Sequence, residues 1–175
     1  LVDAANACCF VHAADLGLTG IEMPEEIEQN AELMKKLQEI RLTASVAMGI
    51  TPNREEAAKK KAVPFIGFVT GPLDSPSLSG SPTSAGEVDL TGRMLSNGQP
   101  HRALPLTCSL CMAVAARIEG SVVNQAARAS TDASAPIRIA MPSGILTVAA
   151  AVAKKDGQWH AEQGAFFRTQ RRMFE

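Results

Sequence analysis

The spacing of apolar residues predicts two helices of different character. Between residues 30 and 49, leucine, isoleucine and alanine recur at three- and four-residue intervals with charged residues between them, which is typical of an amphipathic helix. Asn30 is placed to cap its start and Gly49 to end it. Residues 107–118 are apolar on nearly every side. A helix without a polar face is not stable on a surface, so we expect other elements to enclose this one.

Short apolar runs bounded by turn residues predict strands at residues 2–11, 63–70, 137–140 and 145–153, with a return strand at 158–169. The hairpin signal is Lys155-Asp156-Gly157. Residues 88–95 begin as a strand and are expected to end in a helical turn, and Val122 is expected to start a further strand. This order predicts an α+β fold, in which a mixed or mostly antiparallel sheet carries one long helix and encloses the apolar one.

Composition narrows the classes of protein. The 175 residues are 46% hydrophobic and 20% charged, which suffices for a packed core and argues against disorder. The formal net charge is −1, so no basic surplus favours a nucleic-acid partner. No apolar run has the length of a membrane span. The first residues are typical of a strand, not of a signal peptide, and we expect a cytoplasmic protein.

Four cysteines occur as Cys8-Cys9 and as Cys108-x-x-Cys111. Adjacent cysteines rarely bridge each other, and the second pair lies in the apolar helix, so we expect reduced, buried thiols. A zinc site would need a second well-spaced Cys/His pair, and we therefore expect no metal. A redox CxxC remains a weaker alternative, because no thioredoxin-like βαβ unit surrounds it.

Two short segments have the chemistry to hold an anion. The first is Thr107-Cys108-Ser109, where the helix N–H groups lack acceptors and the helix dipole favours negative charge. The second is the turn Pro142-Ser143-Gly144, which offers a hydroxyl and backbone N–H groups. We expect the two segments to hold a polycarboxylate between them. Simple capping by Thr107 and an ordinary turn at Ser143 are the alternative.

Charged and nucleophilic side chains supply further candidates. His101 precedes the apolar helix and is a candidate substrate-binding residue, although a lone histidine is more often structural. A basic cluster near the end of the chain also suits a carboxylate, with solvated charge as the simpler interpretation; it comprises Arg168, Arg171 and Arg172. Spacing alone assigns no catalytic pair, and Cys108 is a weak candidate for a catalytic group.

Several segments occur in the order found in one known family: VDAANACCFVHAADLGLTG, IRLTASVAMGI, GEVDLTGRMLSNGQPHRALPLT, IEGSVVN, IRIAMPSGILTV and FFRTQRRMFE. On these segments the chain resembles the PrpF family of 2-methylaconitate and aconitate isomerases, which has 4-oxalomesaconate tautomerases as relatives. The resemblance implies a diaminopimelate-epimerase-like fold, in which each of two similar domains wraps a sheet around a central apolar helix. Residues 1–175 would then form a single domain, the C-terminal half of a two-domain protein.

The resemblance also implies a chemistry. The substrate would lie between the two domains, facing Thr107, Cys108 and Ser109, with Ser143 and Gly144 nearby. A base would remove an allylic proton from an unsaturated tricarboxylate, and an acid would return one at the other end of the delocalised anion. The reaction needs no metal and no organic cofactor. The implied partners are a tri- or dicarboxylate and the N-terminal domain, and a homo-oligomer is left open.

The chain departs from the family pattern in three places. The family's acid/base groups, a cysteine in a G-N-C-G-N motif and a lysine, belong to its N-terminal half. Met141 stands where members usually have histidine, and Cys108 where they usually have glycine or alanine. Two alternatives therefore stay open: a non-catalytic carboxylate-binding or dimerising domain, and, as a weaker one, an epimerase or racemase of the same fold. The latter needs a thiol at a position where this chain has Pro105.

Overall fold

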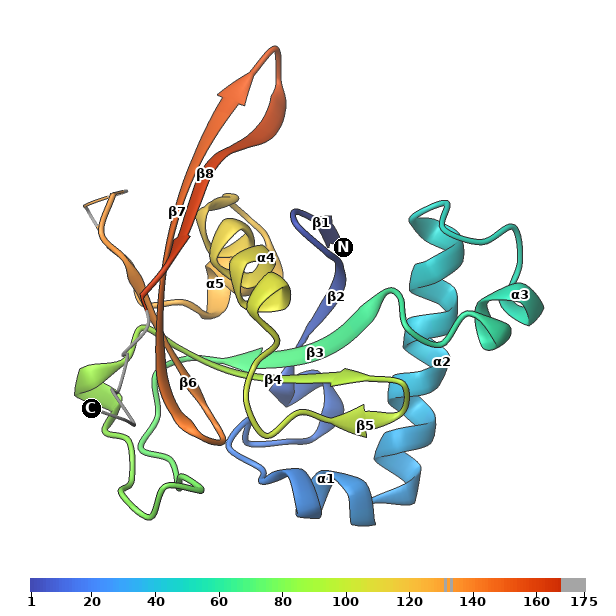
Figure 1. Cartoon of the computed structure of the whole chain (residues 1–175), viewed down its shortest axis with the longest axis horizontal. Helices are drawn as coiled ribbons and strands as arrows, with labels where there is room; N and C mark the ends of the chain where they lie inside the picture. The colour runs from blue at the N-terminus through green and yellow to red at the C-terminus, as the bar shows by residue number, and fades with distance from the viewer. Residues whose placement is uncertain (131, 133, 168–175) are drawn as a thin grey trace, which may run out of the picture.

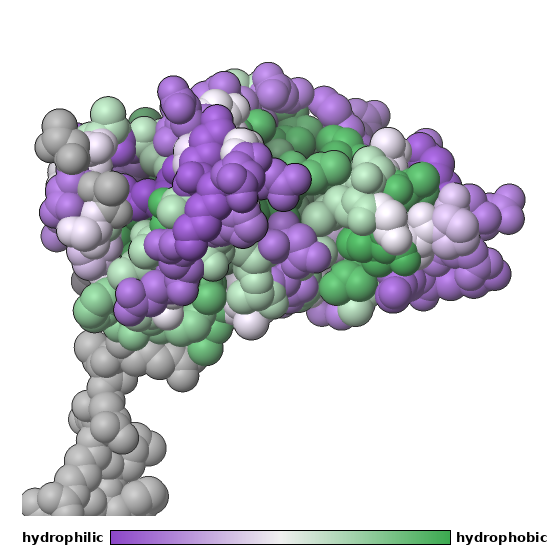
Figure 2. Space-filling model, turned by 90° about the horizontal axis from the view of Figure 1, so that it is seen from above, coloured by the Kyte–Doolittle hydropathy of each residue, from purple (hydrophilic) through white to green (hydrophobic). Residues whose placement is uncertain are grey.

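The computed structural model describes residues 1–130, 132 and 134–167. Along the chain the elements are β1 (Val2–Asp3), β2 (Ala7–His12), η1 (Ala13–Leu16), α1 (Pro24–Gln29), α2 (Ala31–Ala47), α3 (Arg54–Lys59), β3 (Phe65–Thr70), η2 (Ala85–Glu87), β4 (Leu90–Ser96), β5 (Gln99–Pro100), α4 (Leu106–Arg117), α5 (Val122–Ala126), β6 (Ile137–Met141), β7 (Gly144–Lys155) and β8 (Gln158–Phe166). No helix in this described part of the chain is long and apolar enough to cross a membrane. On the face shown in Figure 2, hydrophilic and hydrophobic residues lie side by side.

The strands form one mixed sheet in the order β1-β2-β3-β4-β6-β7-β8, with β5 paired to β4. The pairs β2–β3 and β4–β6 are parallel, and the others are antiparallel. Figure 1 shows the sheet curling, so that β7 and β8 rise away from the direction of β3 and β4. The α+β class with a mixed sheet, expected from the sequence, is confirmed.

Helices pack on both faces of this sheet. On one face, α4 and α5 bury a core with β2, β4, β6 and β7. On the other face, α1 and α2 place Ile27 and Leu37 against Phe68 of β3 (Figure 1). The predicted ends of the long helix are confirmed: the Asn30 side chain accepts a hydrogen bond from the Leu33 N–H at 3.0 Å, and the chain leaves the helix through a left-handed glycine at residue 49.

The apolar helix is buried, as its sequence predicts. Eight of the twelve residues of α4 are buried, and the helix contacts β7, β8, β2, β1 and α5. A bare backbone at Gly92 of β4 makes room for it. A Cβ on Gly92 would lie 2.9 Å from Met112 Sδ, so a larger residue here would force the Met112 side chain of α4 to move aside.

The structure corrects the local predictions at three segments. Residues 2–11 form two strands, because the chain turns at Ala5, which has a φ of 66°. Residues 88–95 contain no helical turn, since β4 continues to Ser96 and pairs with β3 from Thr91 to Leu95. Val122 starts α5, where Ser121 caps the helix, and capping outweighs the β-propensity of valine. Arg168, Arg171 and Arg172 lie outside the described residues.

Candidate functional site

The N-terminal end of α4 carries backbone donors that no helical acceptor satisfies. The helix begins at Leu106 after Pro105, which supplies no side-chain cap. The Ser109 N–H donates to the Pro105 carbonyl at 2.9 Å, so the N–H groups of the three preceding residues lie before the first helical bond. Thr107 is exposed and Leu106 is half-buried. Thr107 is therefore inside the first turn and does not cap it, which corrects the capping interpretation.

A second segment brings an amide to this helix end. Asn6 Nδ2 donates a hydrogen bond to Thr107 Oγ1 at 3.1 Å. Asn6 lies in the turn between β1 and β2, where the left-handed Ala5 reverses the chain. Since the threonine oxygen accepts this bond, its own O–H remains a donor. Sequence reasoning missed Asn6, and the signal for it was a lone amide among small and apolar residues ahead of a buried strand.

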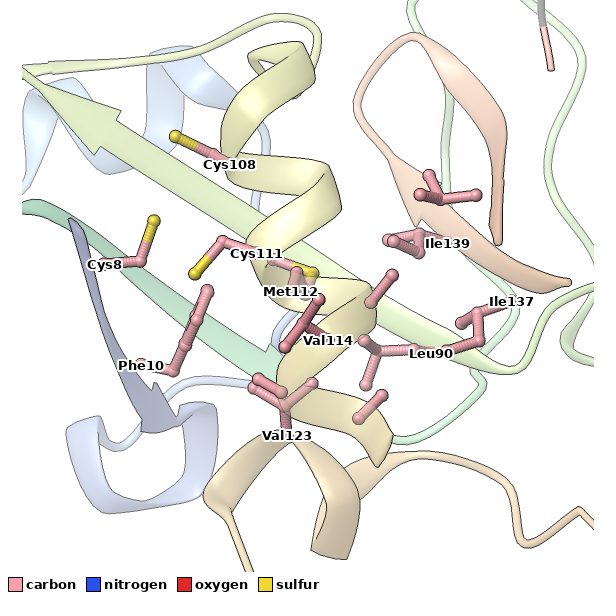
Figure 3. Close-up of a cluster of buried hydrophobic side chains, with 14 of the residues drawn as sticks. Cys8, Phe10, Leu90, Cys108, Cys111, Met112, Val114, Val123, Ile137 and Ile139 are labelled. Atoms are coloured by element: carbon pink, nitrogen blue, oxygen red, sulfur yellow. The ribbon is translucent and has the colours of Figure 1, made fainter. Parts of the chain in front are cut away.

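Cys108 and Ser109, the two residues that follow Thr107, are directed inward. Cys108 and Ser109 are fully buried. The Ser109 hydroxyl donates to the Leu106 carbonyl at 2.8 Å. Figure 3 shows the Cys108 side chain on the same side of α4 as Cys8. Of Thr107, Cys108 and Ser109, Thr107 is therefore the one whose side chain reaches the surface. That all three meet a substrate stays a prediction.

The β6–β7 turn lies beside the segment that leads into α4. The Leu104 N–H donates to Met141 Sδ at 3.3 Å, a bond to a weak acceptor. Ser143 and Gly144 are half-buried, and Gly144 has a φ of 125° that side chains rarely adopt. The two segments expected to hold an anion are thus brought near each other, with the Met141 thioether between them. Binding by Ser143 and Gly144 stays a prediction.

His101 is held by its neighbours at the end of β5. Its Nε2 lies 2.8 Å from Ser96 Oγ, and its ring stacks on Phe65 with the centroids 6.0 Å apart. Burial lowers the pKa of His101, which favours the neutral imidazole at pH 7. The next residue, Arg102, forms an exposed ion pair with Glu25 at 2.7 Å. His101 therefore offers no fixed positive charge, and its binding role stays a prediction.

A cavity of about 800 Å³ lies at the other, C-terminal end of α4. Three arginines line it, and each is engaged with the protein itself. Arg138 binds the Asp89 carboxylate at 2.6 Å and 3.0 Å, Arg128 donates to the Ala85 carbonyl at 2.7 Å, and Arg117 donates to the Ala135 carbonyl. These side chains hold loops together, so we favour the N-terminal end of α4 as the functional site.

Together, the helix N–H groups, the Asn6 amide and the Thr107 hydroxyl form a surface that we call the α4 wall. Such donors hold a carboxylate and stabilise negative charge that develops on a conjugated oxygen. In the described part of the chain, no group of three or more His, Cys, Asp or Glu side chains is arranged to hold a metal ion. The α4 wall therefore has the chemistry of an anion-binding surface.

Comparisons with known proteins identify the family of this chain and several relatives. Residues 1–175 match the family described as "PrpF protein". The whole chain is 40% identical over 177 residues to "3-methylitaconate isomerase" of Eubacterium barkeri, covering 45% of that protein. It is 33% identical over 175 residues to "2-methyl-aconitate isomerase" of Shewanella oneidensis, covering 44% of that protein.

A solved structure described as "Crystal Structure of Methylitaconate-delta-isomerase" has the same fold. The match has a TM-score of 0.82 at 36% identity, and it covers 93% of this chain and 44% of the other. The chain thus spans less than half the length of these relatives.

Proposed function

Because the chain belongs to the PrpF family, we propose that it is part of an isomerase that moves a double bond in an aconitate-like tricarboxylate or a dicarboxylate of the same type. Relatives named 3-methylitaconate isomerase and 2-methyl-aconitate isomerase support this class of reaction. The observation that carries the proposal is the α4 wall, where the Asn6 amide meets Thr107 at the open end of the helix. Converging N–H and O–H donors of this kind suit a carboxylate.

The proposed reaction is a proton shift. A base removes an allylic proton, the negative charge spreads over the double bond and its carboxyl group, and an acid returns a proton at the far carbon. Substrate and product have the same oxidation state, so the reaction requires no redox group, and we propose that it proceeds without a cofactor. The α4 wall would hold one carboxylate and stabilise the charge that develops on it.

The acid and base are proposed to come from another segment. Cys108 is buried, and His101 Nε2 lies 2.8 Å from Ser96 Oγ, so neither side chain is an exposed acid or base on the α4 wall. We propose that the wall faces a second domain of a diaminopimelate-epimerase-like protein, with the substrate between the two. We further propose that this protein works in the cytoplasm.

The same observation favours a second candidate. A surface that binds carboxylates but lacks an exposed acid or base is, by itself, a binding module. The isolated chain would then hold a carboxylate without turning it over. This candidate differs from the first in whether a longer polypeptide adds catalysis.

The binding test uses amide NMR of the chain during titration with trans-aconitate and with 3-methylitaconate. We expect shifts at the amides of residues 106–108. Thr107→Val should weaken binding about ten-fold, because a hydrogen bond to a charged group is lost. Thr43→Val, on α2, is the matched control and should bind like the unchanged chain. Chemical-shift changes confined to other segments would refute carboxylate binding at the α4 wall. An affinity of Thr107→Val equal to that of the unchanged chain would refute it as well.

The activity test follows the same acids by proton NMR in D₂O. It uses the chain with any segment that its gene encodes upstream of Leu1. An isomerase exchanges the allylic proton for deuterium and forms the double-bond isomer. Binding without exchange or isomerisation would contradict the isomerase and support the binding module.

A further inference from the structure

Three thiols meet beneath the α4 wall. Cys8 lies on β2, and Cys108 and Cys111 lie on the first turns of α4. All three are fully buried, and all are free thiols. In Figure 3 the sulfur of Cys8 points toward α4 and that of Cys111 points toward β2. The function proposed above does not use this cluster.

Cys8 and Cys111 are brought together by β1. In the β1–β2 register, Val2 is the partner of Cys8. The Cys111 thiol donates to the Val2 carbonyl at 3.4 Å, so it lies at the same rung of the sheet. The side chains of Cys108 and Cys111 both lie beside the Cys8 thiol and affect its pKa, Cys108 more strongly. Cys9, the next residue on β2, faces the opposite side of the sheet and packs with Ile66 and Phe68.

We propose that Cys8 and Cys111 form a thiol-oxidation site, which hydrogen peroxide converts into a disulfide between β2 and α4. This inference does not rest on the proposed function. It gives a role to Cys111 of the Cys108-x-x-Cys111 motif, and it makes Cys8, outside the motif, its partner. The adjacent Cys9 is excluded by its position on the other face.

The chemistry balances in two steps. The Cys111 thiolate attacks a peroxide oxygen, the O–O bond breaks, and the products are a Cys111 sulfenic acid and hydroxide. The Cys8 sulfur then attacks the Cys111 sulfur, the S–O bond breaks, and the released oxygen leaves as water with the Cys8 proton. Hydroxide takes up the proton that Cys111 lost. In sum, two thiols lose two electrons, and one peroxide becomes two waters.

Hydrogen bonding favours these two roles. The bond from the Cys8 thiol lowers the pKa of Cys111 against the opposing effect of burial, and the Ala4 backbone contributes a further bond. The contacts with Cys108 and Cys111, followed by burial, raise the pKa of Cys8. The thiolate, which is the nucleophile, therefore forms on Cys111. Cys8 stays protonated until it resolves the sulfenic acid.

The short strand β1 covers the Cys8–Cys111 pair, and peroxide would reach the two thiols when β1 opens. β1 has two residues and lies at one end of the strand order. It is paired with β2 only at Val2 and Asp3 among the described residues. Short edge segments of this kind open locally at low cost. Opening β1 removes the Val2 carbonyl from Cys111 and exposes the rung that carries Cys8.

The experiment treats the folded chain with hydrogen peroxide, blocks the remaining thiols with iodoacetamide under denaturing conditions, and maps peptides by mass spectrometry. We expect a mass loss of about 2 Da, two blocked thiols and one Cys8–Cys111 cross-linked peptide, all reversed by dithiothreitol. The bridge encloses a long loop, so the melting temperature of the oxidised chain should rise by about 10 °C.

Matched variants distinguish a specific Cys8–Cys111 disulfide from non-specific oxidation of the cysteines. Cys9→Ala should form the same bridge, whereas Cys8→Ala should form none and should carry a dimedone-reactive sulfenic acid at Cys111. Circular dichroism confirms folding, and Cys8→Val replaces Cys8→Ala if that variant does not fold. A bridge that contains Cys108, a bridge to Cys9, or four intact thiols after peroxide treatment would each overturn the proposal.

Discussion

Replacing Gly67 by alanine tests how closely β3 and β4 approach each other. A Cβ on Gly67 would lie 2.6 Å from the Arg93 carbonyl oxygen on β4, and closer still to Met94 Sδ. Ordinary carbon–oxygen contacts are about 3.3 Å, so the strands would have to separate by roughly 0.7 Å. β4 resists this movement, because the buried Arg93 side chain donates to the Ile21 and Glu22 carbonyls. We expect a loss of about 3 kcal/mol in the free energy of unfolding, at the upper end for overpacking.

Urea unfolding followed by circular dichroism measures this loss. With a slope of about 2 kcal/mol per molar urea, the midpoint should fall by about 1.5 M, and the melting temperature by roughly 9 °C. Gly71→Ala is the matched control one position beyond β3, because its Cβ would meet only the Ala126 carbonyl, at 3.5 Å. Its free energy should change by less than about 0.5 kcal/mol. A Gly67→Ala midpoint equal to that of the control, at an unchanged slope, would refute the close-approach argument.

The remaining predictions concern the Asp89–Arg138 ion pair and the Met141 side chain, which lies beside the segment that leads into α4. Burial opposes ionisation of Asp89, but the hydrogen bonds from Arg138 hold its pKa below the ordinary 3.8. The ionised Asp89 therefore stabilises the fold fully above about pH 4, and this contribution to the free energy of unfolding is lost as the pH falls below that value. Asp89→Asn should therefore be less stable than the unchanged chain at pH 7 in urea unfolding, and a difference that persists at pH 2 would contradict this. Met141→His places an imidazolium beside the Leu104 N–H and should strengthen trans-aconitate binding about ten-fold at pH 6, measured by calorimetry. Met141→Leu should show no gain, and equal affinities of both variants would count against a carboxylate at this position.

Local sequence signals were sufficient for much of the fold. Asn30 and Gly49 marked the two ends of α2, and the absence of a polar side predicted the burial of α4. The hairpin at residues 155–157 forms where expected, with Asp156 and Gly157 both at positive φ, as a tight hairpin turn requires. Each of these outcomes depends on residues within a turn or two of each other. The strand predicted to start at Val122 was wrong, because capping by Ser121 outweighed the β-propensity of valine.

The candidate site was only partly predictable. The sequence located the start of α4 and the turn at Ser143, since helix ends and turns have local signatures. It could not show that Cys108 and Ser109 are directed inward, because the direction of a side chain on an all-apolar helix depends on what packs around it. It also missed Asn6, which meets Thr107 across 101 residues of sequence.

The sequence by itself determined the α+β class, the buried helix and the family, because these follow from residue type, spacing and motif order within short segments. The tertiary structure alone decided the strand order with its two parallel pairs, the meeting of Asn6 with Thr107, and the placement of Cys8 against Cys111 on one face and Cys9 on the other. These contacts join distant segments, and their free energy comes from burying both surfaces together, which no local pattern encodes.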